Sequence, residues 1–220
     1  MTNGGDAPGR RGPGLDGADL GRAGPDGAGL DGAGLDGAGL DGAGLDGAGL
    51  DGAGVEGAGI EAADATAVAA QLGRPPRAVR GVAHRCPCGL PSVVETAPRL
   101  EDGTPFPTLY YLTCSRLNSR LGTLEAEGRM REMTDRLDSD PELAAVYRIA
   151  HESYLAERDA IEPLGTTVSA GGMPDRVKCL HVCVAHALAA GSGVNPFGDE
   201  ALAEVGEWWR QGPCIPAPTH

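Results

Sequence analysis

The segment His84-Arg85-Cys86-Pro87-Cys88-Gly89-Leu90-Pro91 places two thiols one residue apart in a turn rich in proline and glycine. Proline fixes one backbone dihedral angle and glycine permits positive ones, so this segment turns the chain sharply. Paired thiols on a tight turn can ligate a metal ion at little cost in chain ordering. Their separation is, however, shorter than in the usual zinc-binding turns. The segment therefore predicts half of a four-thiol site, and the rest of the fold would bring the other half to it.

The residues on either side of this turn predict a small sheet. Residues 79–85 form a strand that leads into the turn. After it, two segments with strand-forming side chains such as Val93 and Tyr110 flank Asp102-Gly103, a dipeptide that is typical of hairpin turns. We expect the two strands of this hairpin to occupy residues 92–100 and 106–114.

The predicted hairpin bears directly on the thiols. Folding it about Gly103 places Cys114 roughly opposite Ser92, next to the turn that carries the paired cysteines. Cys179 follows a Gly-Gly loop in the first turns of a predicted helix, where the positive end of the helix lowers the pKa of a thiol. We therefore expect a metal site for zinc or, as the alternative, an iron–sulfur cluster, with the ligands Cys86, Cys88, Cys114 and Cys179.

The opposite interpretation is that these cysteines bind nothing. Free cysteines are often buried as small apolar side chains. That interpretation also suits Cys183 and His186, which share a helical face with Cys179 at the spacing of a core stripe. Cys214 lies near the end of the chain, and we predict that it is not a ligand.

Helices are predicted over much of the remaining sequence. Residues 61–72 are rich in alanine and stop at Gly73, and Asp140-Pro141-Glu142 combines a cap, a proline and an acid in a first turn. Apolar residues then recur at helical spacing to about Ile161. Further helices are expected at 118–127, 129–137, 176–190 and 199–209, the last of them capped by Asp199. A small antiparallel sheet packed with several helices is an α+β fold.

Residues 1–60 predict a disordered tail. Five units from Asp26 onward read Asp-Gly-Ala-Gly-Leu, and two more vary this pattern conservatively. The glycines raise the entropic cost of ordering, and one leucine per unit buries little surface in return. We therefore expect low-complexity disorder rather than a pentapeptide-repeat solenoid or a calcium-binding repeat. A single folded domain should occupy residues 61–216.

Charge and composition limit the classes of partner. The chain of 220 residues has a formal net charge of −13, which argues against broad binding to nucleic acid or to anionic membranes. We expect a local basic edge, formed by Arg74, Arg77, Arg80 and Arg85, to be solvated. No segment approaches the ~18 apolar residues of a membrane span, and no apolar leader follows a basic start. A cytoplasmic location is expected, where six cysteines favour thiols or metal ligands over disulfides.

A second candidate site lies in residues 169–178. This segment contains Gly171 and Gly172 and leads into a predicted helix with Arg176 and Lys178 in its first turns. Backbone N–H groups, the helix dipole and the two cations would together hold a phosphate or carboxylate. The spacing is not that of a P-loop, so nucleotide binding is not implied. The alternative is a tight loop whose glycines allow close packing.

Catalytic signatures are sparse in this chain. It contains no serine-hydrolase elbow, paired-carboxylate signature or dinucleotide fingerprint. A thiol nucleophile at Cys179 is the remaining candidate, with His181 or His84 as its base, because an activated cysteine needs a nearby base.

Three motifs support a family resemblance when they are taken together. They are 85–91, 102–114, and 169–181 with Gly193-Val194-Asn195-Pro196. In these motifs, over about residues 65–212, the chain resembles an uncharacterised bacterial family, the domain of unknown function 501. The resemblance implies a cytosolic protein typical of high-GC Gram-positive bacteria, and it implies no established activity. The motif thiols of the family fall on the four predicted ligands, with His181 beside them.

The sequence leaves three functions open. The first is a metal-binding domain with a small anionic ligand at 169–178. The second is a thiol- or metal-dependent enzyme that acts on a phosphate- or carboxylate-bearing small molecule. The third is a structural or partner-binding module without metal. Metal content and thiol reactivity separate the three.

Overall fold

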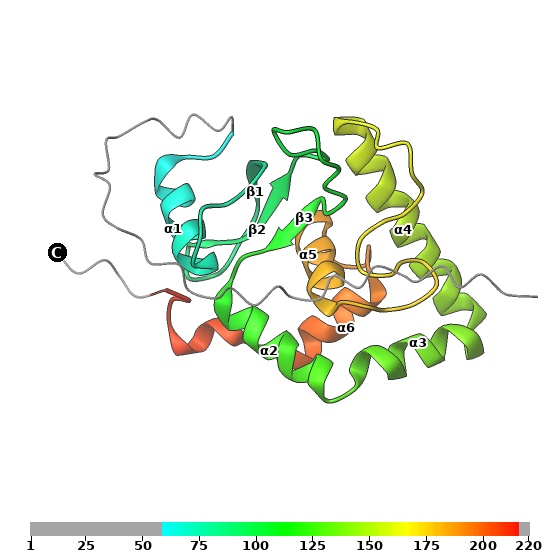
Figure 1. Cartoon of the computed structure of the whole chain (residues 1–220). Helices are drawn as coiled ribbons and strands as arrows, with labels where there is room; N and C mark the ends of the chain where they lie inside the picture. The colour runs from blue at the N-terminus through cyan, green and yellow to red at the C-terminus, as the bar shows by residue number, and fades with distance from the viewer. Residues whose placement is uncertain (1–58, 216–220) are drawn as a thin grey trace, which may run out of the picture. The chain divides into compact units, whose positions relative to one another are not determined.

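An antiparallel sheet and six α-helices make up residues 59–215, the part of the chain that this computed structural model describes (Figure 1). The elements in chain order are α1 (Ala62–Leu72), β1 (Val79–Arg85), β2 (Pro91–Thr96), β3 (Tyr110–Leu112), α2 (Ser115–Ala126), α3 (Arg129–Ser139), α4 (Pro141–Ile161), α5 (Leu180–Ala190), α6 (Pro196–Val205) and the 3₁₀ helix η1 (Trp208–Gln211). The predicted α+β class is confirmed. The predicted repeat tail lies outside the described residues except for its last two positions.

The sheet has the order β1-β2-β3, and both pairs of strands are antiparallel. Val93 lies opposite Leu112, and Thr113 N donates to Ser92 O at 2.9 Å. This register centres the hairpin on the predicted turn and brings Cys114 close to the expected position. The strands are shorter than predicted because prolines between Thr96 and Tyr110 cannot donate hydrogen bonds to a ladder.

The two faces of the sheet meet different partners. On one face, Val93, Tyr110 and Leu112 join the main core, where α5 packs across all three strands (Figure 1). On the other face, Val94 and Tyr111 line a small cavity of about 110 Å³ together with residues that follow α1. The sheet is therefore covered on both sides, which explains why most of β2 is buried.

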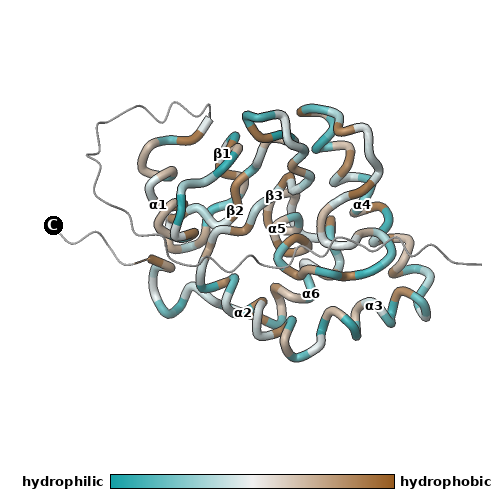
Figure 2. Tube along the Cα trace, in the orientation of Figure 1, coloured by the Kyte–Doolittle hydropathy of each residue, from teal (hydrophilic) through white to brown (hydrophobic). Residues whose placement is uncertain are grey.

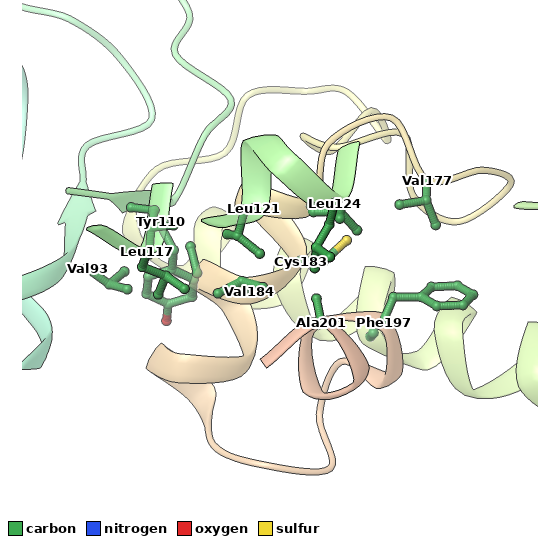
Figure 3. Close-up of a cluster of buried hydrophobic side chains, with 14 of the residues drawn as sticks. Val93, Tyr110, Leu117, Leu121, Leu124, Val177, Cys183, Val184, Phe197 and Ala201 are labelled. Atoms are coloured by element: carbon green, nitrogen blue, oxygen red, sulfur yellow. The ribbon is translucent and has the colours of Figure 1, made fainter. Parts of the chain in front are cut away.

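The main core lies between the sheet and helices α2, α4, α5 and α6 (Figure 3). Leu117, Leu121 and Leu124 extend it along one face of α2. Tyr147 and Phe197 meet edge to face with ring centroids 4.8 Å apart, and they join α4 to α6. Figure 2 shows the tube alternating between apolar and hydrophilic residues along α2, α3 and α4, as amphipathic helices do.

Three predicted helix starts are wrong. The helix expected from residue 118 begins at Ser115, with Cys114 as its cap. Tertiary contacts explain one of the other two. The helix expected from Arg176 begins only at Leu180, because the carboxylate of Glu125 on α2 accepts the hydrogen bond of Leu180 N and caps it there. The helix expected from Asp199 begins earlier, at Pro196, with Asn195 as its cap. It ends at Val205 rather than at Trp209, because Gly206 takes a positive φ of 66°.

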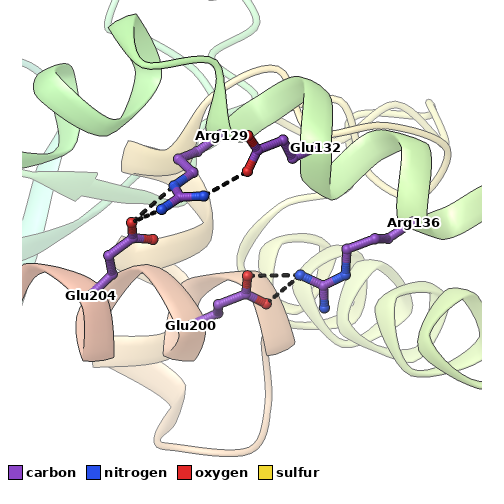
Figure 4. Close-up of polar contacts among 5 residues, drawn as sticks. All are labelled: Arg129, Glu132, Arg136, Glu200 and Glu204. Carbon is purple, nitrogen blue, oxygen red and sulfur yellow. Dashed lines mark hydrogen bonds and ion pairs between the residues drawn. The ribbon is translucent and has the colours of Figure 1, made fainter.

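Helix α6 is held on two sides. On one side it pairs with α3, where Arg129 contacts Glu204 and Arg136 contacts Glu200, at 2.5 and 2.7 Å (Figure 4). On the other side it crosses α5 closely, since a Cβ atom on Gly198 would lie 2.2 Å from the backbone oxygen of Cys183. Exposed ion pairs contribute little free energy, so the close packing at Gly198 contributes more to this arrangement than they do.

No helix within residues 59–215 combines the length and the apolar character that a membrane span requires. The expected cytoplasmic location stays a prediction. In the basic edge, two of the four arginines are paired: Arg80 with Glu95 at 2.9 Å and Arg85 with Asp64 at 2.6 Å.

Candidate metal centre

Three potential metal ligands converge where α2 ends and α5 begins. Glu125 lies in the last turn of α2, Cys179 caps α5, and His181 lies in the first turn of α5. Their ligand atoms all lie within 4.8 Å of one another. Among residues 59–215, no other group of three His, Cys, Asp or Glu side chains is that close. This cluster is therefore the strongest candidate for a metal centre in the described part of the chain.

Local structure fixes each of the three side chains. Glu125 Oε1 accepts from Leu180 N at 2.7 Å, so the carboxylate that caps α5 also faces the cluster. His181 Nδ1 lies 3.1 Å from Glu125 Oε1 and 3.7 Å from Cys179 Sγ. His181 Nε2 donates to the backbone oxygen of Asn118 at 3.3 Å. A carbonyl oxygen only accepts, so Nε2 carries a proton, and Nδ1 is the nitrogen that a metal ion would bind in place of a proton.

Two of the three separations between these atoms are close to those of a zinc site. Tetrahedral zinc with Zn–S of about 2.3 Å and Zn–N and Zn–O of about 2.1 Å holds S and N about 3.6 Å apart, and N and O about 3.4 Å apart. The corresponding distances here are 3.7 Å between Cys179 and His181, and 3.1 Å between His181 and Glu125. The hydrogen bond from His181 Nε2 to a backbone carbonyl is the usual support of a metal-ligating imidazole.

The electrostatics of the cluster favour positive charge at its centre. Contact with Cys179, and then with Glu125, raises the pKa of His181 to about 10. Although burial acts against it, the pKa of Glu125 is lowered by His181 and by the N–H of Leu180. The carboxylate therefore stays ionised and can balance a cation between these groups.

The cluster opens on a cavity beside β3. The cavity has a volume of about 410 Å³, and its lining includes Thr108, Tyr110 and Val182 as well as Cys179 and His181. A space of this size suits a small molecule. Two of the three candidate ligands thus face a space in which a reactant could bind.

The other predicted ligands lie elsewhere. Cys86, Cys88 and Cys114 come together at the start of α2, and the thiol of Cys214 adjoins those of Cys88 and Cys114. Cys179 instead contacts Glu125, at the far end of α2 and about 16 Å along the helix from Cys114. The structure thus brings together three of the four predicted thiols and places Cys214, rather than Cys179, beside them.

The predicted anion-binding residues line one cleft. Gly171, Gly172, Arg176 and Lys178 all border a cleft of about 830 Å³ between α4 and the loop that precedes α5, together with Arg148. Because α5 begins at Leu180, the two predicted cations lie in this loop and not in helical turns. The helix dipole therefore contributes less here than the sequence predicts.

The loop of this cleft is shaped by buried groups. Arg158, fully buried on α4, donates to Val168 O at 2.7 Å and to Thr166 O at 2.9 Å. Gly172 has a φ of 89°, and a Cβ atom there would lie 2.9 Å from Arg176 O. The close packing expected under the alternative interpretation is therefore present, whether or not an anion binds.

Two residues of these clusters were not predicted from the sequence. Glu125 follows Leu117 and Leu121 at helical spacing, so an acid on an otherwise apolar helix face was the available signal. Cys214 gave no local signal, because its position depends on contacts with α1 and α2. Gln71 donates to its sulfur at 3.1 Å, and Ser115 donates to its backbone oxygen at 2.7 Å.

Comparisons with known proteins identify one family model. The model described as "Protein of unknown function (DUF501)" matches residues 82–203. No curated protein and no solved structure matches the chain. The matched segment contains Glu125, Cys179 and His181, and it ends before Cys214.

Proposed function

The chain belongs to the DUF501 family of proteins of unknown function, so its activity has to be inferred from its own residues. We propose that it is a metal-dependent enzyme that binds a divalent ion, preferably zinc, through Glu125, Cys179 and His181. The observation that carries this proposal is the convergence of three ligand atoms at the wall of a cavity. Structural zinc sites are closed by four protein ligands, whereas catalytic sites keep a position open. Three ligands beside a cavity fit the second class.

The residues around the ion would have defined tasks. Bound there, zinc would supply a Lewis acid for a reactant in the cavity. Glu125 would ligate the ion and at the same time hold the start of α5 through Leu180 N. Asn118 would keep the imidazole of His181 oriented through its backbone oxygen. The hydroxyl of Thr108 and the neighbouring apolar residues would position a small molecule.

The cleft beside α4 supports a second proposal, an anion subsite. Arg148, Arg176 and Lys178 bring three cations to it, against the acids Glu152 and Asp175. Guanidinium and ammonium groups of this kind hold phosphate or carboxylate. Titration of the full chain with inorganic phosphate, followed by NMR, should show binding that Lys178→Ala weakens at least several-fold. Equal binding by the variant and the parent chain would contradict this subsite.

Thiol chemistry without metal is the competing function for the same residues. Cys179 caps α5 and lies 3.7 Å from His181 Nδ1, an arrangement that can activate a thiol nucleophile. In the metal-free chain, fast alkylation of Cys179 that zinc does not slow would favour this function. Alkylation that zinc suppresses would favour the metal centre.

Zinc content tests the metal centre directly. The full chain is purified without oxygen, and the zinc per chain is measured for the parent and for Cys179→Ala. We expect the variant to contain about one zinc ion fewer per chain, because a ligand set reduced to two holds zinc weakly. Cys183→Ala is the matched control, since Cys183 is a buried thiol on the same helix outside the cluster. Equal zinc in Cys179→Ala and the parent would contradict the proposal.

A further inference from the structure

Four cysteines from three distant segments meet at the start of α2. Cys86 and Cys88 lie in the turn between β1 and β2, Cys114 caps α2, and Cys214 follows η1. The thiol of Cys88 adjoins those of Cys86 and Cys214, and the thiol of Cys114 adjoins that of Cys214. All are free thiols. This cluster is separate from the centre at Glu125 and is not used by the function proposed above.

One hydrogen-bond donor reaches a sulfur of this cluster, and a second donor, without a partner among the described residues, lies beside another. Gln71 Nε2, from the last turn of α1, donates to Cys214 Sγ at 3.1 Å. The side chain of Trp208 is buried and lies next to the Cys86 thiol, and its Nε1 has no hydrogen-bond partner among residues 59–215. A buried N–H without a partner is destabilising. A thiolate at Cys86 would give this donor a strong acceptor, which an apolar thiol does not.

The cluster lacks positive charge of its own. Cys86 and Cys114 are both buried, at 4% and 0% exposed. The strongest influences on these thiols are burial, backbone groups, Trp208 and one another, with no cationic side chain among them. Hydrogen bonds to sulfur would stabilise thiolates, and the negative charge of these thiolates would then need an added cation to balance it. Zinc is the common ion with this preference for thiolates.

We propose that Cys86, Cys88, Cys114 and Cys214 form a second, closed zinc site that fastens the C-terminal segment to the β1–β2 turn and the start of α2. Each thiol gives up one proton as it binds, and no electron is transferred. No three of the four sulfurs lie within 4.8 Å of one another, whereas tetrahedral zinc holds its sulfurs about 3.8 Å apart. Zinc would therefore draw the segments together.

The second site has a direct consequence for the C-terminal segment. Hydrogen bonds already hold this segment on α2: Arg116 donates to Pro213 O at 3.1 Å, and Ser115 donates to Cys214 O at 2.7 Å. These bonds position Cys214 before any metal arrives. Cys214 lies beyond the segment that matches the family model, so this chain completes the site with a residue from outside that segment.

Metal content of variants tests the proposal and separates it from the first centre. In the full chain purified without oxygen, Cys214→Ala should lose the zinc ion of the second site, and Cys179→Ala should lose the zinc ion of the first centre. The double variant should therefore contain about two zinc ions fewer per chain than the parent. Cys183→Ala again serves as the control. If Cys214→Ala keeps the zinc of the parent chain, the second site is refuted, and the first centre is still judged by Cys179→Ala alone.

Two measurements do not depend on removing a ligand. Alkylation of the zinc-loaded parent chain, read by peptide mass spectrometry, should protect all four cysteines together until a chelator is added. Labelling of Cys214 at the same rate before and after chelation would overturn the proposal.

Trp208→Phe keeps an aromatic ring and removes only the N–H, so it should release zinc from the second site about 10-fold faster. If Trp208→Phe releases zinc at the same rate as the parent chain, the N–H of Trp208 does not support a zinc site at these cysteines.

Discussion

Replacing Glu157 by Gln should lower the free energy of unfolding at neutral pH by about 1–2 kcal/mol. Glu157, on α4, accepts hydrogen bonds from Tyr110 at 2.6 Å and from Ser153 at 2.8 Å. Its carboxylate also faces Nε2 of the buried His186 at 4.0 Å. His186 first, and then the two hydroxyl groups, lower the pKa of Glu157 to about 2. Gln has the same shape and can still hydrogen-bond to both hydroxyls, so the substitution removes mainly the charge.

The sign of the pH dependence follows from the lowered pKa. The usual pKa of this carboxyl is 4.5, so its ionisation stabilises the fold above pH 4.5, and this stabilisation is lost as the pH falls towards about 2. Each pH unit between the two pKa values corresponds to about 1.4 kcal/mol, which gives about 3.4 kcal/mol in full. The side chain of Glu157 is 34% exposed, and screening by solvent reduces this figure to about 1–2 kcal/mol.

Urea denaturation of the full chain and of Glu157→Gln provides the test. The difference in unfolding free energy should be constant between about pH 7 and pH 5, and it should lose about two fifths of its value by pH 3.5. Glu152→Gln is the control, because Glu152 lies on the same helix and is exposed. A difference that is absent at pH 7, or that stays unchanged down to pH 3.5, would show that the charge of Glu157 does not stabilise the fold.

Three further substitutions test the packing. Arg158→Met leaves Val168 O and Thr166 O without their buried donor, so it should lower the free energy of unfolding by about 3 kcal/mol or more in urea denaturation. A decrease as small as that caused by Arg148→Met, at an exposed arginine, would contradict this. Gly198→Ala forces a methyl group against Cys183 O and should destabilise the fold by about 1–3 kcal/mol or more; an unchanged melting temperature would mean that α5 and α6 are not in close contact. Asp140→Ala removes the acceptor for Glu142 N and Leu143 N and should cost about 1 kcal/mol; no change in thermal denaturation would show that the cap is dispensable.

Elements with local signals could be predicted from the sequence. Helix α1 stops at Gly73, which takes a left-handed conformation, and α4 starts at Asp140 with both cap hydrogen bonds in place. Strand β1 has the expected bounds. The end of α6 also had a local signal in Gly206, and the prediction that continued the helix to Trp209 overlooked it. In these cases one or two adjacent residues decide the structure.

The candidate centre could be predicted only in part. Cys179 was predicted as a ligand from its place at a helix start, and His181 as a base beside it, but their partner Glu125 comes from another helix and also decides where α5 begins. The position of Cys214 depends on contacts with Gln71 and Ser115, which are far away in sequence. Contacts of this kind are set by the packing of the whole domain, and no pattern along the chain encodes them.

Anomalous diffraction from zinc in crystals of the full chain would test the metal centre most directly. Data collected on both sides of the zinc absorption edge locate the ion independently of any assumption about its ligands. We expect a zinc peak bounded by Glu125 Oε1, Cys179 Sγ and His181 Nδ1, with an open side towards the cavity beside β3. Zinc-saturated crystals with no peak between these three atoms would contradict it, even if a peak appeared among the four cysteines.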